Sequence, residues 1–305
     1  MWKNTFTKKE HREAWLDIAK AFGIGLVVLS HTEINIPLVG YFGGMFMIPV
    51  FFVTAGYTYR DKGEDFSVFM KGKAKRLLLP YFVTNVFLVA FFVILNRGIS
   101  KPSLLGIFYS RSMLMRADSP WNMALMSSLN SPTWFLTCLF LSLCVYRLID
   151  RKLSDAKKRR IAVIAAMAFG ILFRYVSPVL LPWAAENALL FLGMLELGRT
   201  LKEGGLSWLR KNQWIYANFL LGFVTFAYLN GAVNVSISEY GHSMLLFALI
   251  GALGSLLCMK AAELTEKYLR FLVRPLAFVG RHTLEILCWH LFALEILKKI
   301  ISLLA

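Results

Sequence analysis

The stretch WLDIAKAFGIGLVVLSH, residues 15–31, places Asp17, Lys20 and His31 within an apolar run long enough to approach the thickness of a bilayer. Ionisable residues are costly at that depth, so those present are expected to face protein or water and to mark a functional site. Lys20 and His31 are eleven positions apart, about three helical turns or ~16 Å, and Asp17 shares their face. We therefore predict an ion pair and an imidazole that face one cavity.

Plainer interpretations of the three residues exist. Asp17 and Lys20 could pair while reaching toward the membrane interface, and His31 could be an interfacial residue at the end of the helix. In the functional interpretation, the imidazole is a general base near neutral pH. No HExxH or comparable spacing is present, so we expect no metal site.

Apolar runs of membrane-spanning length recur along the whole chain, which has 305 residues and is 57% hydrophobic. We predict an all-α fold, a polytopic membrane helical bundle of about nine or ten transmembrane helices that form a single domain, 1–305. The expected helices are 14–34, 43–60, 77–96, 133–149, 161–176, 184–200, 213–230, 241–259 and 283–304. A tenth is possible within 100–128 or before 283.

The net charge of +16 is divided into short Lys and Arg clusters between the apolar runs, which is the positive-inside pattern and not a nucleic-acid patch. A cytoplasmic N-terminus then places the basic gaps 61–76, 150–160, 201–212 and 260–275 inside. We expect a multi-pass protein of the cell (inner or plasma) membrane, with lipids as partners and no nucleic acid. The outer gap 97–132 is also basic, either to serve a substrate or because a long loop translocates regardless of charge.

Five blocks follow one another in a familiar order. They are LDIAKAFGIGLVVLSH (16–31), MIPVFFVTAGYTYR (47–60), KGKAKRLLLPYF (71–82), PTWFLTCLF (132–140) and FVGRHTLEILCWHLFAL (278–294). Together they cover nearly the whole chain, which resembles the integral membrane acyltransferase-3 family and, within it, the branch of fucose 4-O-acetylase-like sugar O-acetyltransferases. Two positions depart from the family pattern. Lys20 stands where most members have Arg, which removes bidentate recognition, and Thr54-Ala55 replaces a family serine.

The resemblance implies an O-acyltransferase that moves an acyl group, usually acetyl, from cytoplasmic acetyl-CoA to a sugar hydroxyl. The acceptor would be a surface or secreted polysaccharide of the cell envelope or its lipid-linked precursor. His31, Lys20 and Asp17 are the catalytic candidates. The candidates for holding the CoA phosphates are Arg12, Lys20, Lys73, Lys75 and Arg76. The candidates for contacting the acceptor are Glu33, Trp121, Trp134, Arg111, Arg116 and His290.

Several alternatives stay open at this stage. His31 either removes the proton of the acceptor hydroxyl during direct transfer or forms a covalent acyl-imidazole. His290 contacts the acceptor or is a core residue, and the tryptophans bind sugar or form an interfacial belt. A transporter or flippase for lipid-linked sugars is the main rival function, although no internal repeat supports it. A non-catalytic scaffold would not require ionisable residues on one face.

Overall fold

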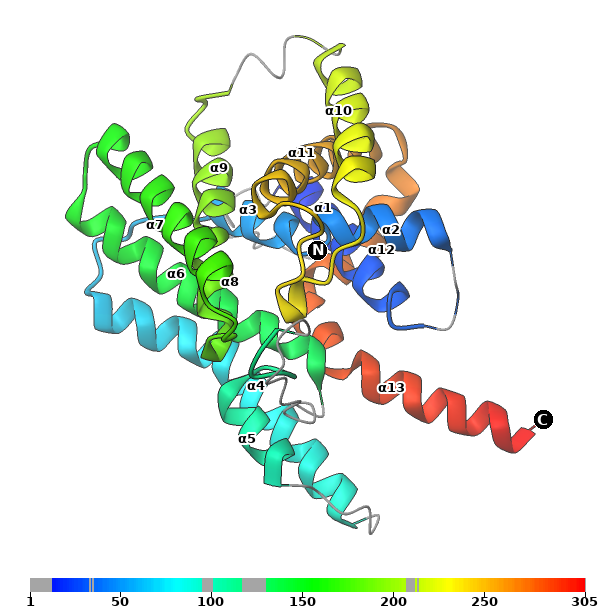
Figure 1. The fold of residues 1–305 in the computed structure, drawn as a ribbon. Coiled ribbons are helices and arrows are strands. Elements are labelled where there is room, and N and C mark those ends of the chain that lie inside the picture. The colour runs from blue at the N-terminus through cyan, green and yellow to red at the C-terminus, as the bar shows by residue number, and fades with distance from the viewer. Residues whose placement is uncertain are drawn as a thin grey trace, which may run out of the picture.

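The computed structural model describes residues 13–32, 34, 36–94, 101–116, 130–206, 212 and 214–304, and this part of the chain is helical (Figure 1). Within these ranges no strand forms, and only two isolated β-bridges occur. The α-helices are α1 Ala14–Leu29, α2 Pro37–Phe46, α3 Pro49–Tyr57, α4 Phe66–Ile94, α5 Lys101–Tyr109, α6 Trp134–Lys152, α7 Ala156–Val176, α8 Ala185–Leu190, α9 Leu192–Lys202, α10 Trp214–Asn230, α11 Met244–Tyr268, α12 Arg270–Arg281 and α13 Thr283–Leu304. The 3-10 turns are η1 Ser131–Thr133, η2 Pro182–Ala184 and η4 Val235–Ile237. The all-α prediction is confirmed for the described residues.

Four helical stretches in the described part of the chain are long and apolar enough to cross a membrane. They are Val39–Tyr57, Phe66–Phe91, Ser131–Lys152 and Met244–Tyr268. The helix Trp214–Asn230 is apolar but shorter. The membrane class of the fold is supported, whereas the number of nine or ten spans stays a prediction.

Several helix boundaries differ from the expected ones. α1 ends at Leu29 and not at residue 34, so His31 lies in the turn that follows the helix. The expected helix 43–60 is divided into α2 and α3, and Pro49 begins the second of them. Proline has no N–H to continue the preceding helical ladder, which explains a break at this point.

α4 begins at Phe66, well before the expected start at residue 77. The prediction followed the apolar boundary, but the basic segment before that boundary is also helical. Lys71, Lys75 and Arg76 are exposed on its surface. Lys and Arg are good helix formers, so a charged segment can extend an apolar helix past the edge of its hydrophobic run.

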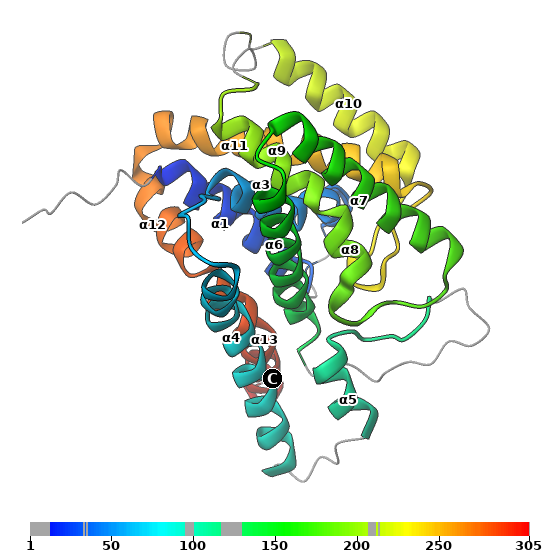
Figure 2. The ribbon, with the colours of Figure 1, turned by 90° about the vertical axis from the view of Figure 1, so that its left-hand side faces the viewer.

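α1 lies in the middle of the helical assembly, where it contacts α2, α3, α11, α12 and α13 (Figures 1 and 2). Its residues Ile18, Ala19 and Ile24 are buried. The neighbours of α1 come from both ends of the chain. Asp17, near the start of this helix, is therefore buried against protein.

Two glycines let α3 and α9 cross with their backbones in contact. A Cβ on Gly56 would overlap the carbonyl oxygen of Leu195, and one on Gly198 would overlap that of Val53. Small residues permit this close approach between apolar helices. The crossing accounts for the glycine in the MIPVFFVTAGYTYR block.

Ion pairs connect several of the segments that were expected inside to neighbouring helices. The pairs are Glu13–Lys202, Asp61–Arg147, Asp150–Arg199 and Arg159–Glu196. In the loop between α3 and α4, the backbone N–H of Gly63 and then the Arg147 guanidinium hold the pKa of Asp61 below its usual value. The alternating topology predicted from charge stays a prediction.

A second group of polar contacts joins three segments that were expected outside. Arg111, from the 97–132 segment, pairs with Glu186 and donates to the carbonyl oxygen of Ser236 at 2.8 Å. Arg174 donates to the carbonyl oxygen of Ser238 at 2.7 Å, next to the same loop. The assignment of these gaps to two sides of a membrane stays a prediction. Which end faces the cytoplasm stays a prediction.

Candidate active site

The acidic and basic residues near the start of α1 form the predicted ion pair. Lys20 Nζ lies 2.6 Å from Asp17 Oδ1. Asp17 is only 1% exposed, because α12 crosses directly over it and Gly280 leaves no room for a Cβ above the Asp17 carbonyl. A buried carboxylate needs a cation of this kind to offset its desolvation. Lys20 remains partly exposed, with 23% of its side chain accessible.

His31, in the turn after α1, is held in one tautomer by the backbone. Its Nδ1 lies 2.7 Å from the carbonyl oxygen of Val27. A carbonyl oxygen only accepts hydrogen bonds, so Nδ1 carries the hydrogen and Nε2 of the neutral ring keeps its lone pair. The His31 side chain is exposed. This arrangement provides an oriented proton acceptor.

The ring of His31 packs edge-on against His290 of α13, with the ring centroids 5.1 Å apart and an interplanar angle of 65°. Nδ1 of His290 lies 3.1 Å and 3.0 Å from the carbonyl oxygens of Ile286 and Leu287. Its Nε2 therefore also carries a lone pair. The sequence analysis gave His31 as a catalytic candidate and His290 as a candidate for contacting the acceptor, and the structure shows that their rings are in contact.

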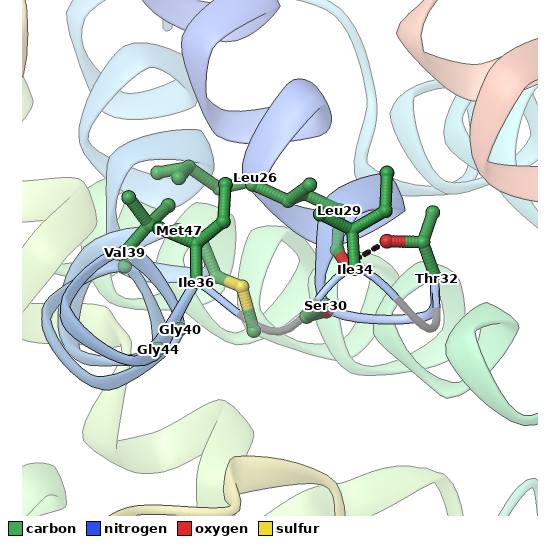
Figure 3. Close-up of a pocket in the computed structure, with 11 residues that line it drawn as sticks. Leu26, Leu29, Ser30, Thr32, Ile34, Ile36, Val39, Gly40, Gly44 and Met47 are labelled. Carbon is green, nitrogen blue, oxygen red and sulfur yellow. Dashed lines mark hydrogen bonds between the residues drawn. The ribbon is translucent and has the colours of Figure 1, made fainter.

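A pocket of about 370 Å³ opens beside the His31 turn, between the end of α1 and α2 (Figure 3). Ser30 and Thr32, the chain neighbours of His31, contribute to its wall, and the Thr32 hydroxyl donates to the Leu29 carbonyl at 2.8 Å. The remaining lining is Leu26, Leu29, Ile34, Ile36, Val39, Gly40, Gly43, Gly44 and Met47. Most of the lining residues are apolar, and neither Lys20 nor His31 is among them. The single cavity predicted to join Lys20 to His31 thus stays a prediction.

Three of the five basic candidates for donor binding lie near the start of α4. Lys73 is half-buried and its Nζ lies 5.2 Å from the centroid of the Phe69 ring. Lys75 and Arg76 are exposed. Both exposed side chains are accessible to an anionic ligand, whereas Arg12 lies outside the described residues.

Arg111 was expected to contact the acceptor, but its surroundings favour a structural role. The side chain is buried, pairs with Glu186, and donates to the carbonyl oxygen of Leu181 at 3.3 Å and to the Ser238 hydroxyl at 3.2 Å. Glu186 also accepts from Ser238 at 2.9 Å. The guanidinium thus has protein partners on all its nitrogens, and it fastens three segments together.

The other residues expected to contact the acceptor sugar differ in burial and in their contacts. Arg116 is half-buried and donates to the carbonyl oxygen of Arg174 at 3.0 Å. Trp134 is 5% exposed and belongs to the core, which favours packing over sugar stacking. Glu33 and Trp121 lie outside the described residues. Among the residues that the structure does describe, no group of three His, Cys, Asp or Glu is placed to hold a metal ion.

A polar cluster that the sequence analysis did not single out lies between α4, η1 and α13. Asn85 donates to the Thr133 hydroxyl at 3.2 Å, Thr133 donates to the Asn130 carbonyl at 2.7 Å, and Asn130 donates to the Cys288 carbonyl at 2.6 Å. All three polar residues are buried. Asn85 sits inside an apolar run, so the rule that selected His31 would have found it if applied to uncharged polar residues.

Comparison with known protein families identifies the region that these helices form. The acyltransferase-3 family model, described as an acyltransferase domain, matches residues 13–305. No curated protein and no solved structure matches the chain. The matched region includes every described residue of the candidate site.

Proposed function

Because the chain belongs to the acyltransferase-3 family and is an acyltransferase, we propose that it acts in the cell membrane on sugars. In this proposal it takes an acyl group, acetyl in the first instance, from cytoplasmic acyl-CoA. It passes the group to a hydroxyl of a surface or secreted polysaccharide or of its lipid-linked precursor. The observation that carries the proposal is His31, held with Nε2 as a proton acceptor at the end of α1.

The chemistry assigned to His31 is direct transfer. Nε2 takes the proton of the acceptor hydroxyl while the hydroxyl oxygen attacks the thioester carbonyl. The new C–O bond forms, the C–S bond breaks, and the leaving thiolate of CoA takes the proton from the imidazolium. A positioned base of this kind contributes about 10²–10⁴-fold to the rate.

Cationic side chains support the donor half of the proposal. CoA carries several phosphate charges, and Lys75 and Arg76 are exposed where an anion can reach them. In this account Lys20, Lys73 and Arg12 add to the same field. Asp17 holds Lys20 in place at 2.6 Å and keeps the ammonium near the first turns of α1.

The proposal is tested by incubating membranes that contain the protein with acetyl-CoA labelled in the acetyl group. The label is expected in a glycan or lipid-linked sugar, and mass spectrometry of that product is expected to show one added acetyl. Membranes with an equal amount of the His31→Ala variant are expected to give no labelled product. A transporter would label no glycan in either sample, and that result would overturn the proposal.

A further inference from the structure

Three buried side-chain atoms around α13 have no hydrogen-bond partner among the described residues. They are Oδ1 of Asn85, Oδ1 of Asn130 and Nε2 of His290. Their residues are 0%, 1% and 6% exposed. A buried polar atom without a partner costs about 1–3 kcal/mol, so three in one region call for a ligand or a function.

The backbone identifies all three atoms as hydrogen-bond acceptors. Nδ2 of Asn85 donates to the carbonyl oxygen of Tyr81 at 2.8 Å, and Nδ2 of Asn130 donates to that of Cys288 at 2.6 Å. Those carbonyl oxygens cannot donate, which fixes each amide with its oxygen as the free atom. His290 uses Nδ1 in the same way. The missing partners are therefore donors.

The three residues are connected to one another and to the candidate base. Thr133 links Asn85 to Asn130, and Asn130 is fastened to α13 at Cys288, two positions before His290. His290 in turn contacts the ring of His31. A ligand that supplies donors to this region would therefore lie close to the group assigned to proton removal.

We propose that Asn85, Asn130 and His290 bind the hydroxyl groups of the acceptor, and that the acceptor is a neutral sugar at this position. The inference rests on the proposed function and adds to it the residues that hold the acceptor. A sugar ring presents several O–H donors, and the three unpartnered atoms are all acceptors. None of the three side chains carries a full charge in the tautomers described. A carboxylate or phosphate on the sugar would find no counter-charge from them.

The test measures binding, so that it does not depend on transfer. Purified protein in detergent is mixed with methyl glycosides of glucose, galactose, mannose and fucose, and binding is followed by saturation-transfer NMR. At least one glycoside is expected to bind the wild-type protein. Asn85→Leu and Asn130→Leu should each weaken that binding about 3- to 10-fold, the loss expected for one hydrogen bond. The affinity for acetyl-CoA should be unchanged.

Two further variants separate binding from folding. His290→Leu should lose glycoside binding, whereas His290→Gln, which keeps an acceptor atom, should retain part of it. Asn187→Leu is the matched control, because Oδ1 of Asn187 already accepts from the Tyr240 hydroxyl at 2.5 Å. It should lower the unfolding temperature without weakening glycoside binding by the folded protein.

Three results would overturn the inference. They are no glycoside binding to the wild-type protein, binding that the leucine variants leave unchanged, or a loss of acetyl-CoA affinity in those variants. The last result would indicate that Asn85, Asn130 and His290 accept hydrogen bonds from the amide N–H groups of acetyl-CoA and not from a sugar. Glycoside binding without any acetyl transfer would contradict the proposed function and leave the subsite standing.

Discussion

The rings of His31 and His290 are oriented by the same kind of hydrogen bond to the backbone. In each ring Nδ1 is bonded to a backbone carbonyl of the preceding helical turn, and Nε2 is left as the basic atom. The two residues differ in burial, since His31 is exposed and His290 is 6% exposed. An exposed imidazole can exchange its proton with solvent or product. We therefore assign proton removal to His31 and hydroxyl binding to His290.

Direct transfer predicts that His31 is never acetylated. Purified protein incubated with labelled acetyl-CoA in the absence of an acceptor, then quenched and digested, should give an unlabelled His31 peptide by mass spectrometry. In the direct reaction the imidazole handles only a proton and makes no bond to carbon. An acetyl group on His31 under these conditions would instead establish the covalent variant.

At the same scale, the sequence indicated which residues are candidates for function better than it indicated which distant residues they contact. Asp17, Lys20 and His31 were marked because ionisable side chains are rare in an apolar run, and the Asp17–Lys20 pair followed from their spacing. The contacts His31–His290 and Arg111–Glu186 join segments far apart in the chain. Nothing in the local pattern of one sequence specifies which distant helices meet.

At the scale of elements, the first turns of α4 carry the donor-binding prediction. The double variant Lys75→Gln/Arg76→Gln should raise the KM for acetyl-CoA several-fold and leave kcat nearly unchanged, because it removes charge that binds the donor without taking part in the chemistry. Both side chains are exposed, so stability should not change.

The matched control for this variant is Lys157→Gln/Lys158→Gln, an exposed basic pair at the start of α7. It removes the same net charge from another element. Equal KM values for the two double variants would show that only the overall charge of the protein matters. That outcome would remove α4 from the donor site.

The crossing of α3 and α9 makes a prediction about stability. Gly198→Ala places a methyl group against the Val53 carbonyl and should lower the free energy of unfolding by about 1–3 kcal/mol. Gly72→Ala in α4 meets no atom within 4 Å, so it should stabilise its helix by about 0.5–1 kcal/mol. Thermal unfolding in detergent measures both. Equal melting temperatures would contradict the close crossing.

At this scale, some helix boundaries could be predicted from the sequence and others could not. The break before α3 was foreseeable, because Pro49 stands inside the expected helix 43–60. The early start of α4 was not, since hydropathy locates the part of a helix that suits lipid and says nothing of a charged extension. The separation of α12 from α13 depends on packing, as α12 lies across α1 at Gly280.

At the scale of the whole molecule, the ionic cluster holds one end of the helical assembly together. Glu196 accepts from Arg159, Arg160 and Tyr146, and it is 7% exposed. Removing one partner of a buried ion pair leaves the other charge uncompensated, which costs about 3–5 kcal/mol. Glu196→Gln should therefore lower the free energy of unfolding by an amount in that range.

The control is Glu263→Gln, which breaks a partly exposed pair with Lys260. Pairs of that kind contribute less than about 1 kcal/mol because water and salt screen them. Urea or thermal unfolding of the two variants in the same detergent should separate them clearly. If Glu196→Gln is as stable as Glu263→Gln, the cluster does not hold this end of the molecule together.

The alternation of charge along the chain predicts which segments share a side of the membrane, and this topology stays a prediction. Arg159 and Glu203, from two segments expected inside, form an ion pair, and the carbonyl oxygens of Leu181 and Ser236, from two segments expected outside, both accept from Arg111. Positive residues at the ends of spans carry that information directly. Arg111, one of the four basic residues in the expected outer segment 97–132, has a structural role instead, since it is buried and paired with Glu186.

The central claim is that His31 removes the acceptor proton during acyl transfer. The most direct test is the initial rate of labelled acetyl transfer to the glycan by His31→Gln in proteoliposomes. His282→Gln is the matched control, since Nδ1 of His282 is also bonded to a carbonyl four residues earlier, at 2.8 Å. The account predicts that His31→Gln lowers the rate by about 10²–10⁴-fold and that His282→Gln leaves it close to the wild-type value. A His31→Gln rate within a few-fold of wild type would contradict the account.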